Sequence, residues 1–409
     1  MKIAILGNGK EGKAVREYFE AQGDECQIFE NFADKDIDSF DLNKFDEVFR
    51  SPSVRPRSGW NSSTKYFLEN CPCPIIGVTG TKGKGTTCSL ISSILKSLGK
   101  KTWLVGNIGN PAITELDKVS GDDVVVYELS SFQLWDLERS PNVAVVLPIE
   151  PDHLNVHKDF DEYVEAKSNI ARWQKADDCC IYNSNNEFSV KVANTSVAQK
   201  LAYPIVNKSE KLISALNSLS IVGEHNRENA EAALLAVAAY FKMNLDEFLA
   251  EYFEDVCVGL RDFKGLPHRL EFLRELNHVR YFDDNFATNV ASTSVAVKAF
   301  PDDNLVMIVG GRDKTDNEDL PELYDLLMNS QIKKVILMGE SGHELASRHQ
   351  DKKFIIVESL KEAVLAAKSE AEKFGNSVVL MSPAAASFDM FENVYDRGGQ
   401  FQKLISELK

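Results

Sequence analysis

The sequence predicts an α/β protein built from parallel sheets with crossover helices, in two or three domains. Runs rich in β-branched residues, such as "PIIGVTG" (74–80) and "NLVMIVGG" (304–311), alternate with helix-like segments such as the amphipathic stretch "HNRENAEAALLAVAAYF" (225–241). The length of 409 residues exceeds what a single hydrophobic core usually serves. A "CPCP" break at residues 71–74 and a loop-like stretch near residue 264 separate three blocks. We expect domains at residues 1–72, 73–264 and 265–409.

The composition argues against several classes of protein. The chain has 46 basic and 62 acidic residues and a net charge of −16, so we expect no general affinity for nucleic acid or anionic membranes. No N-terminal segment resembles a signal peptide, and no apolar run approaches the roughly 20 residues of a spanning helix, so we expect a cytoplasmic protein. The seven cysteines include no C-x-x-C pair. We expect reduced, mostly buried thiols rather than disulfides or a zinc site.

A glycine-rich turn follows the first predicted strand. Gly7, Gly9 and Gly12 form a G-x-G-x-x-G pattern between that strand and a helix, and Glu30 ends the next strand. The pattern is typical of dinucleotide-binding folds. The block before the break is roughly half of what a nicotinamide site uses, so we expect a half-site for a nucleotide diphosphate. A turn with a structural role alone is the alternative, because an isolated glycine pattern is weak evidence.

The strongest local signal is "GVTGTKGKGTT" (77–87), which has the features of a phosphate-binding loop. Residues 75–79 form a predicted strand, and Gly80 and Gly83 allow the backbone N–H groups to turn inward. Lys84 opens a helix whose positive end favours phosphate. A plain glycine-rich turn is the alternative, but strand, glycines, lysine and helix all occur in the expected order.

The loop departs from the usual formula at its magnesium position. Gly85 stands where G-x-x-x-x-G-K-[ST] has a serine or threonine. Thr86 and Thr87 in the first helical turn carry the nearest hydroxyl groups. We therefore expect one of these two threonines to bind the metal ion.

Two predicted strands of the second block lead into acidic residues. Glu128 ends the buried strand of "VVVYELSSFQL", where open α/β sheets keep their ligands. The next strand ends just before Glu150, Asp152 and His153, a group of oxygen ligands with one imidazole that suits Mg²⁺. A run of solvated loop charges is the alternative for the second group.

These motifs resemble those of the ATP-dependent Mur ligases, most closely the branch of the family that adds D-glutamate. The resemblance covers nearly the whole chain and rests, in family order, on "GTKGKGTT", "GNIGNPA", "ELSSFQL", "DHL" followed by "EAK", "GEHNRENA", "GLPHRLE", "DDNFATN" and "SPAAASFDMFENVYDRGGQF". It implies a Rossmann-like N-terminal uridine-nucleotide domain, a central P-loop ATPase-type domain and a C-terminal Rossmann-like domain that receives the amino acid.

The resemblance also implies an enzyme of cytoplasmic peptidoglycan precursor synthesis, with a part in cell shape and division. Such enzymes phosphorylate the L-alanine carboxylate of UDP-N-acetylmuramoyl-L-alanine with ATP, and the amine of D-glutamate then attacks the acyl phosphate. Two Mg²⁺ ions and a monomeric protein are expected. Most of the catalysis should come from positioning and charge neutralisation.

Roles for individual residues follow from the same resemblance. Contacts to ATP are implied for Gly80, Thr81, Lys82, Gly83, Lys84, Gly85, Thr86, Thr87, Asn226, Asn229, Arg269 and Asp284. Magnesium ligands are implied at Thr86, Glu128, His153 and Lys167, and catalytic roles at Lys84, Lys167 and His153. Contacts to the UDP-substrate are implied for Gly7, Asn8, Gly9, Glu30, Ser51, Asn107 and Ser130. Contacts to D-glutamate are implied for Thr288, Lys314 and Ser387.

The interpretation of Lys167 depends most on the resemblance. The matching lysine of the family is carbamylated, which turns its amine into an acid group that helps to hold a metal ion. Without the resemblance, we would expect Lys167 to be a solvated lysine on a helix.

Several positions depart from the family pattern. Lys82 replaces an asparagine of the loop, and Phe286 stands where the family has a lysine. One cationic contact is therefore missing, for which Lys82 or Arg312 could compensate. Val394 stands where the family usually has phenylalanine, which loosens one wall of the amino-acid pocket and puts strict D-glutamate selection in doubt.

The N-terminal domain is shorter than in the family. It has "RSPSVRP" (50–56) where "SPG" is usual. Uridine recognition is therefore expected to differ in detail, with Arg50, Ser51 and Arg55 as donors for a diphosphate.

Two other functions remain open. A folylpolyglutamate-synthase-like glutamate ligase shares the acyl-phosphate chemistry, but it needs a pterin pocket rather than the N-terminal "GNGKEG" half-domain. A catalytically impaired nucleotide-binding homologue is suggested by Phe286 and Gly85. The presence of Glu128, His153 and Lys167 argues against it, because an inactive site has no need of both halves of a metal site.

Overall fold

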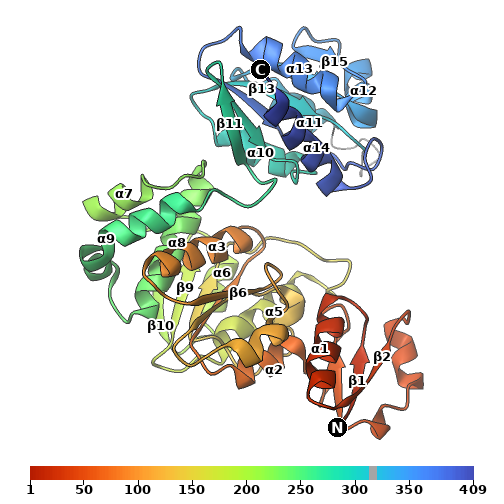
Figure 1. Cartoon of the computed structure of the whole chain (residues 1–409), viewed down its shortest axis with the longest axis vertical. Coiled ribbons are helices and arrows are strands. Elements are labelled where there is room, and N and C mark those ends of the chain that lie inside the picture. The colour runs from red at the N-terminus through yellow and green to blue at the C-terminus, as the bar shows by residue number, and fades with distance from the viewer. Residues whose placement is uncertain (313–319) are drawn as a thin grey trace. The chain divides into compact units, whose positions relative to one another are not determined.

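The computed structural model describes residues 1–312 and 320–409 and confirms the α/β class (Figure 1). The chain forms two compact units, residues 1–219 with 227–263 and residues 220–226 with 264–409. The first unit contains two sheets and the second unit contains one. Lys314, which the sequence predicts to contact the amino acid, lies outside the described residues.

The first sheet is formed by the N-terminal residues. Its elements are β1 (Lys2–Leu6), α1 (Lys10–Ala21), β2 (Glu25–Phe29), the 3₁₀ helices η1 (Asp34–Ser39) and η2 (Leu42–Lys44), β3 (Glu47–Arg50), β4 (Asn61–Ser62) and α2 (Ser63–Asn70). The strands are parallel in the order β2-β1-β3-β4. Ile3 and Ile5 of β1 pack with Val15 and Phe19 from one face of α1. The expected strand, glycine turn and helix are confirmed.

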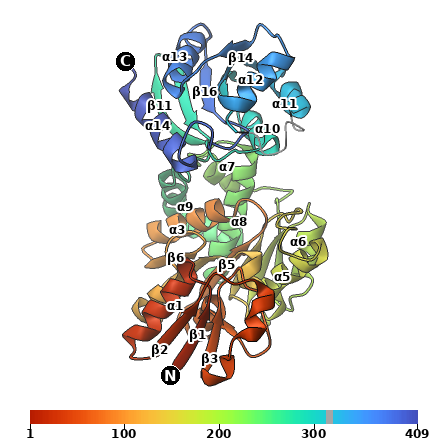
Figure 2. The ribbon, with the colours of Figure 1, turned by 90° about the vertical axis from the view of Figure 1, so that its right-hand side faces the viewer.

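The second sheet is the centre of the first unit. Its elements are β5 (Ile75–Thr79), α3 (Lys84–Ser97), β6 (Thr102–Gly106), η3 (Ala112–Lys118), β7 (Val124–Glu128), α4 (Ser131–Leu134), β8 (Val143–Val146), α5 (Phe160–Arg172), β9 (Cys179–Asn183), α6 (Glu187–Ala193), β10 (Gln199–Tyr203), α7 (Glu210–Leu216), α8 (Glu224–Tyr240) and α9 (Leu245–Asp262). Six parallel strands run in the order β10-β9-β8-β5-β7-β6. Figure 2 labels two of them, β5 and β6. One face packs against α3, α7, α8 and α9, and the other against α2, α5 and α6. Because both faces are covered, β5, β7 and β8 are buried at every position.

The helix α8 differs from the amphipathic helix that the sequence predicts. Every residue from Ala230 to Ala238 is buried. Even Glu231 lies inside, where its carboxylate forms an ion pair with Lys208 Nζ at 2.7 Å and accepts a hydrogen bond from the Ile205 N–H at 2.8 Å. The prediction of one polar face is wrong because the sheet and the neighbouring helices enclose this part of α8 on all sides.

The third sheet forms the core of the second unit. Its elements are β11 (Glu271–Leu276), β12 (Val279–Asp283), α10 (Val290–Lys298), β13 (Asn304–Val309), α11 (Leu320–Leu327), β14 (Ile332–Leu337), α12 (Gly339–Arg348), β15 (Phe354–Ile356), α13 (Leu360–Ala371), β16 (Ser377–Met381) and α14 (Val394–Glu407). The order is β11-β12-β16-β13-β14-β15, and only β11 is antiparallel to its neighbour. The hairpin that adds β11 turns at Asn277 and His278, both with positive φ, as a two-residue hairpin turn requires. The sequence analysis missed this edge strand.

Two global expectations can be compared with the structure. All seven cysteines are free thiols and six of them are buried, which confirms the expectation of thiols rather than disulfides. Within residues 1–312 and 320–409, no helix combines the length and the apolar character that crossing a membrane requires.

Candidate active site

The phosphate loop joins β5 to α3 at the carboxyl edge of the central sheet. Gly80 and Gly83 have φ values of +147° and +84°, and a Cβ on Gly80 would lie 2.6 Å from the Cβ of Leu147. Glycine alone fits these positions without strain. Lys84 is the first residue of α3, and its Nζ donates to the carbonyls of Gly80 and Thr81 at 3.0 and 2.9 Å. The predicted strand, loop and helix are therefore present.

Lys167 reaches the same loop from α5 and is 1% exposed. Its Nζ donates to the Gly80 carbonyl at 2.8 Å and to Thr79 Oγ1 at 3.3 Å, and it lies 4.7 Å from the centre of the Tyr163 ring. Burial lowers the pKa of the Lys167 amine well below its usual range, and the charge of Lys84 lowers it further. The expectation of a solvated lysine is wrong because α5 packs this residue against the loop.

Glu128 ends β7, the strand beside the loop's own strand. Its register partner in β5 is Val78, and its side chain is buried. Burial raises the pKa of the Cys88 thiol, and the charge of Glu128 adds to that rise while the charge of Lys84 opposes it. A carboxylate and an ammonium group therefore both act on the first turns of α3.

Two threonines of the loop helix differ in their accessibility. Thr87 is fully buried, and its Oγ1 has no hydrogen-bond partner among the residues that the structure describes. Thr86, one position earlier, is half-buried. A ligand in the loop reaches Thr86 more easily, which favours Thr86 over Thr87 as the hydroxyl ligand.

Residues 150–153, which follow β8, are exposed. The Nε2 of His153 lies 3.6 Å from Asp152 Oδ2, and the Nζ of Lys82 lies 3.6 Å from Glu150 Oε2. Within the described part of the chain, Asp152 and His153 approach one another, but the three residues Glu150, Asp152 and His153 do not gather their ligand atoms into one group. The magnesium group of Glu150, Asp152 and His153 therefore stays a prediction, and in this structure its charged side chains are exposed.

A cavity of about 520 Å³ connects the glycine turn of the first sheet with the carboxyl edge of the second. Predicted residues in its walls are Gly7, Asn8, Gly9, Ser51, Asn107 and His153. Asn8 Nδ2 also donates to Glu30 Oε2 at 2.6 Å, which places Glu30 at the same turn. Glu11 and Phe132 line the cavity as well, although the sequence analysis gave neither residue a role.

Three polar residues expected near the substrate are engaged in the fold itself. Ser130 caps α4 with its side chain. Arg50 is fully buried in an ion pair with Asp136, and Arg55 pairs with Glu162 at 2.9 Å. For Arg50 the expectation of a donor to a diphosphate is wrong, because its buried guanidinium joins the N-terminal residues to the central ones. For Arg55, whose side chain is 43% exposed, it stays a prediction.

The two predicted asparagines of α8 are both buried. Asn229 lies next to the phosphate loop, since a Cβ on Gly83 would be 2.7 Å from its Oδ1. The Nδ2 of Asn226 donates to the Val222 carbonyl at 2.7 Å, and Asn226 belongs to the second compact unit. The structure therefore places Asn229 at the loop within the first unit, and the contact of Asn226 with ATP stays a prediction.

Arg269 and Asp284 lie in the second unit. The guanidinium of Arg269 is exposed and lies 5.3 Å from the centre of the Phe286 ring. Asp284 is buried and accepts hydrogen bonds from Ser382 Oγ at 2.8 Å and from the Leu270 N–H at 3.2 Å. Burial raises the pKa of the Asp284 carboxyl to about 7, against the effect of these hydrogen bonds.

A polar network that the sequence analysis missed lies beside these two residues. The Nδ1 of His268 is 2.7 Å from Asp283 Oδ2, and this contact raises the pKa of the His268 imidazole. Gln402 Nε2 donates to Glu271 at 2.9 Å and to Asp283 at 3.0 Å. Histidine and two carboxylates could also hold a metal ion here, but the Gln402 amide already donates to both carboxylates. The sequence did contain one signal for this network, because His268 and Asp283 are direct neighbours of the predicted residues Arg269 and Asp284.

The predicted amino-acid residues are only partly described. Ser387 is buried, and its Oγ has no hydrogen-bond partner within the described ranges. Thr288 is half-buried, and Lys314 lies outside the described residues. The ring of Phe286 packs 5.3 Å from that of Tyr395, so an aromatic pair occupies the position where the family has a lysine.

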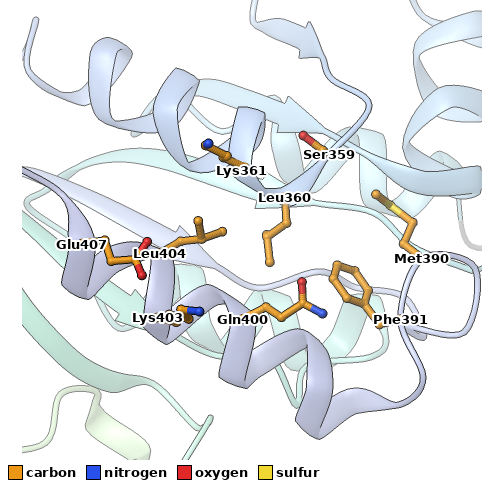
Figure 3. Close-up of a pocket in the computed structure, with 9 residues that line it drawn as sticks. All are labelled: Ser359, Leu360, Lys361, Met390, Phe391, Gln400, Lys403, Leu404 and Glu407. Carbon is orange, nitrogen blue, oxygen red and sulfur yellow. The ribbon is translucent and has the colours of Figure 1, made fainter.

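A second cavity, of about 510 Å³, lies between α13 and α14 in the second unit (Figure 3). Leu360, Phe391 and Leu404 give it an apolar lining, and Lys361 and Lys403 lie along its two helices. None of the described residues with a predicted role lines this cavity. It is therefore separate from the candidate site.

Comparisons with known proteins agree with this geometry. The Mur ligase middle domain matches residues 78–237, and the Mur ligase glutamate ligase domain matches residues 268–385. The UDP-N-acetylmuramoylalanine--D-glutamate ligase of Clostridium kluyveri is 34% identical over 404 residues, covering 90% of this chain and 84% of that protein.

Two solved structures have a similar fold. They are the UDP-N-acetylmuramoylalanyl-D-glutamyl-2,6-diaminopimelate--D-alanyl-D-alanyl ligase from Acinetobacter baumannii (TM-score 0.62, 17% identity, 99% of this chain and 93% of that chain) and the MurF ligase from Thermotoga maritima in complex with ADP (TM-score 0.61, 16% identity, 99% and 95%). Together with the sequence matches, they show that the chain belongs to the Mur ligase family of ATP-dependent, amide-bond-forming ligases.

Proposed function

We propose that this protein joins D-glutamate to UDP-N-acetylmuramoyl-L-alanine in the synthesis of peptidoglycan precursors. The relative from Clostridium kluyveri supports this choice of substrates. The structural observation that carries the proposal is the cavity shared by the N-terminal glycine turn, Asn107 and His153. Asn107 and His153 follow β6 and β8, so they lie at the edge of the sheet that also holds the phosphate loop. A nucleotide held by the turn would present its far end to that loop.

The proposed reaction has two chemical steps. A carboxylate oxygen of the alanyl group attacks the γ-phosphorus of ATP, the bond from that phosphorus to ADP breaks, and an acyl phosphate forms. The amine of D-glutamate then attacks the acyl carbon and loses a proton, and the C–O bond to phosphate breaks as phosphate leaves. A carboxylate is a poor electrophile, and phosphorylation converts one of its oxygens into a good leaving group. The protein has to position the reactants and neutralise their charge.

The phosphate loop supplies most of that neutralisation. We assign Lys84 to the terminal phosphates of ATP, because it opens the helix directly after the loop. Asn229 beside Gly83 and, from the second unit, Asn226, Arg269 and Asp284 are the other proposed nucleotide contacts. The remaining loop residues would contact the phosphates through backbone N–H groups.

The residues present fit a magnesium ion. A buried carboxylate at Glu128 and an accessible hydroxyl at Thr86 are the hard oxygen ligands that Mg²⁺ prefers. A bound Mg²⁺ would neutralise phosphate charge. We propose a second ion near His153 and Lys167. The lowered pKa of Lys167 favours the neutral amine, which can attack CO₂, form an N–C bond, lose a proton and leave a carbamate.

Other parts of the proposal concern specificity and setting. We assign Thr288, Ser387 and Lys314 to the amino-acid pocket, and domains to residues 1–72, 73–264 and 265–409. We also propose that the protein works as a monomer in the cytoplasm. The Val394 and Phe286 substitutions make the preference for D-glutamate the part of the proposal that most needs a measurement.

A single assay tests this function. Purified protein, ATP, Mg²⁺ and UDP-N-acetylmuramoyl-L-alanine are mixed with D-glutamate, L-glutamate or other amino acids, and phosphate release is followed. We expect release that depends on the nucleotide substrate and is fastest with D-glutamate. Release with another amino acid but not with D-glutamate would overturn the proposed specificity. Release with a reduced folate in place of the uridine nucleotide would favour a folate-type ligase.

A further inference from the structure

Glu11 places an acidic group in a cavity that the proposed function gives to a nucleotide diphosphate. It lies in the first turn of α1 and lines the cavity together with Gly7, Gly9 and Lys10. The beginning of a helix attracts phosphate, but an ionised carboxylate at the same place repels it. The protonation state of Glu11 therefore matters for binding.

The hydrogen bonds around Glu11 determine which of its oxygens can carry a proton. The Ser130 N–H donates to Gln133 Oε1 at 2.9 Å. Because a backbone N–H can only donate, this contact fixes the Gln133 amide with its oxygen toward Ser130. The opposite end of the amide, Nε2, donates to Glu11 Oε1 at 2.6 Å. Oε1 is thus an acceptor, and a proton on Glu11 belongs on Oε2.

Oε2 is buried and has no hydrogen-bond partner among the residues that the structure describes. Arg50 of β3 is the cation that acts on Glu11, and it is already paired with Asp136. Burial raises the pKa of the Tyr127 phenol in β7, and the charge of Glu11 adds to that rise. Lys10 and His153 lie in the cavity walls and are exposed. Burial raises the pKa of the Glu11 carboxyl to about 7, although Gln133 and Arg50 oppose the shift.

We propose that Glu11 binds the nucleotide substrate in its protonated form, with the buried Oε2–H turning toward the cavity to donate a hydrogen bond to a phosphate oxygen, so that binding takes up a proton. This inference rests on the proposed function, because it takes the cavity to hold a nucleotide diphosphate. Glu11 then determines specificity in a way that a permanently protonated donor would not, because its carboxyl can donate a hydrogen bond to an anion only while it carries a proton. Gln133 positions it through the bond to Oε1.

The direction of the pH dependence follows from linkage. Below about pH 7 Glu11 is already protonated, and binding needs no proton from solution. Above that value each binding event takes up a proton, so Kd is expected to rise by about tenfold per pH unit. The two phosphates of a nucleotide diphosphate ester stay ionised throughout this range, so the ligand adds no pH dependence of its own.

The test is calorimetric titration of the full chain with UDP-N-acetylmuramoyl-L-alanine at pH 6.5, 7.5 and 8.5, in two buffers with different enthalpies of protonation. We expect the Kd of the wild type to rise by about tenfold from pH 7.5 to 8.5, with uptake approaching one proton. The amide of Glu11→Gln keeps a hydrogen-bond donor but does not titrate. For this variant we expect the Kd to change by less than about twofold between pH 6.5 and 8.5, and we expect no proton uptake on binding. Glu17→Gln, which removes an exposed charge from the same helix, should behave like the wild type.

Each other outcome decides against the inference. Wild-type binding that is tight, independent of pH and free of proton uptake overturns it while leaving the proposed substrate intact. The same holds if folded Glu11→Gln keeps the pH dependence or no longer binds. If the wild type fails to bind the nucleotide at every pH, the proposed function itself is contradicted, and the role of Glu11 with it.

Discussion

The phosphate loop and residues 150–153 follow neighbouring parallel strands of the central sheet, yet they are built in opposite ways. In the loop, Lys84 and Lys167 both donate to the carbonyl of Gly80, and Lys167 is buried. At residues 150–153 the charged side chains are exposed and lie near one another or near Lys82. Packing fixes the lysine side chains at the phosphate loop, whereas the charged side chains of residues 150–153 are exposed to water.

This difference gives the two regions different physical roles. A charge in a low-dielectric site interacts strongly with a phosphate, and hydrogen bonds that are already in place need little reorganisation during the reaction. Exposed charges are screened by water and salt. We therefore expect substitutions in the loop to reduce turnover much more than substitutions at residues 150–153.

The largest effect is expected for Lys84→Ala. Loss of the ammonium group at the terminal phosphates should reduce phosphate release with all substrates by about 10³-fold. Lys96→Ala is the matched control, because it removes an exposed lysine from the last turn of the same helix, and its turnover should stay within about twofold of the wild type. Near-normal turnover of Lys84→Ala would rule out this loop as the phosphate site.

Lys167→Ala is expected to reduce turnover by about 10²-fold, because it removes a proposed metal ligand. Wild-type activity should fall when CO₂ is removed from the buffer and recover with bicarbonate, whereas the variant should respond to neither change. Lys158→Ala serves as the control, since Lys158 is exposed and bonds Glu162 only through its backbone N–H. An unaltered rate for Lys167→Ala would refute the carbamate.

His153→Ala tests the exposed side of the comparison. We expect a loss of about tenfold at low Mg²⁺ concentration, which is recovered at high Mg²⁺ concentration because the ion keeps its other ligands. Phosphate release measured over a series of Mg²⁺ concentrations checks this. A loss as large as that of Lys84→Ala, without recovery, would remove the contrast between the two regions.

The smallest effect concerns stability. Since the folded-state pKa of Lys167 is lowered, the folded chain holds the proton of this amine less tightly than the unfolded chain does, so the buried lysine costs stability at neutral pH. Lys167→Met should raise the free energy of unfolding at pH 7 by on the order of 1 kcal/mol. The difference should narrow as the pH approaches about 10.4, where the unfolded lysine loses its proton.

Urea unfolding in CO₂-free buffer at several pH values measures this difference, with His153→Ala as a control that should leave stability unchanged. Lower stability of Lys167→Met at pH 7 would mean that the two hydrogen bonds of Lys167 outweigh its burial.

Local chemistry made part of this site predictable from the sequence. Ten residues contain the strand, Gly80, Gly83 and Lys84 in this order, and each of these features has its own backbone or electrostatic reason. Glu128 was predictable too, because an apolar run of strand length that ends in a carboxylate indicates the carboxyl edge of a buried sheet. The parallel strands of all three sheets followed from the alternation of strand-like and helix-like segments.

Long-range packing made the rest unpredictable. Lys167 looks like any helix lysine until α5 is placed against the loop, 87 residues away in the chain. Arg50 looks like a diphosphate donor until its partner Asp136 is known. Glu11 was hidden within a motif read for its glycines, since only the fold brings Gln133 to its side. Such contacts join distant parts of the sequence, and no local pattern indicates them.

The most direct test of the proposed chemistry follows the oxygen atoms of the alanyl carboxylate. UDP-N-acetylmuramoyl-L-alanine with ¹⁸O in both carboxylate oxygens is turned over with ATP, Mg²⁺ and D-glutamate, and the phosphate is analysed by mass spectrometry. An acyl phosphate formed at this site predicts one ¹⁸O atom in each released phosphate and one in the amide product. Phosphate that carries no ¹⁸O would contradict the transfer of a phosphoryl group to the carboxylate and, with it, the assignment of the site.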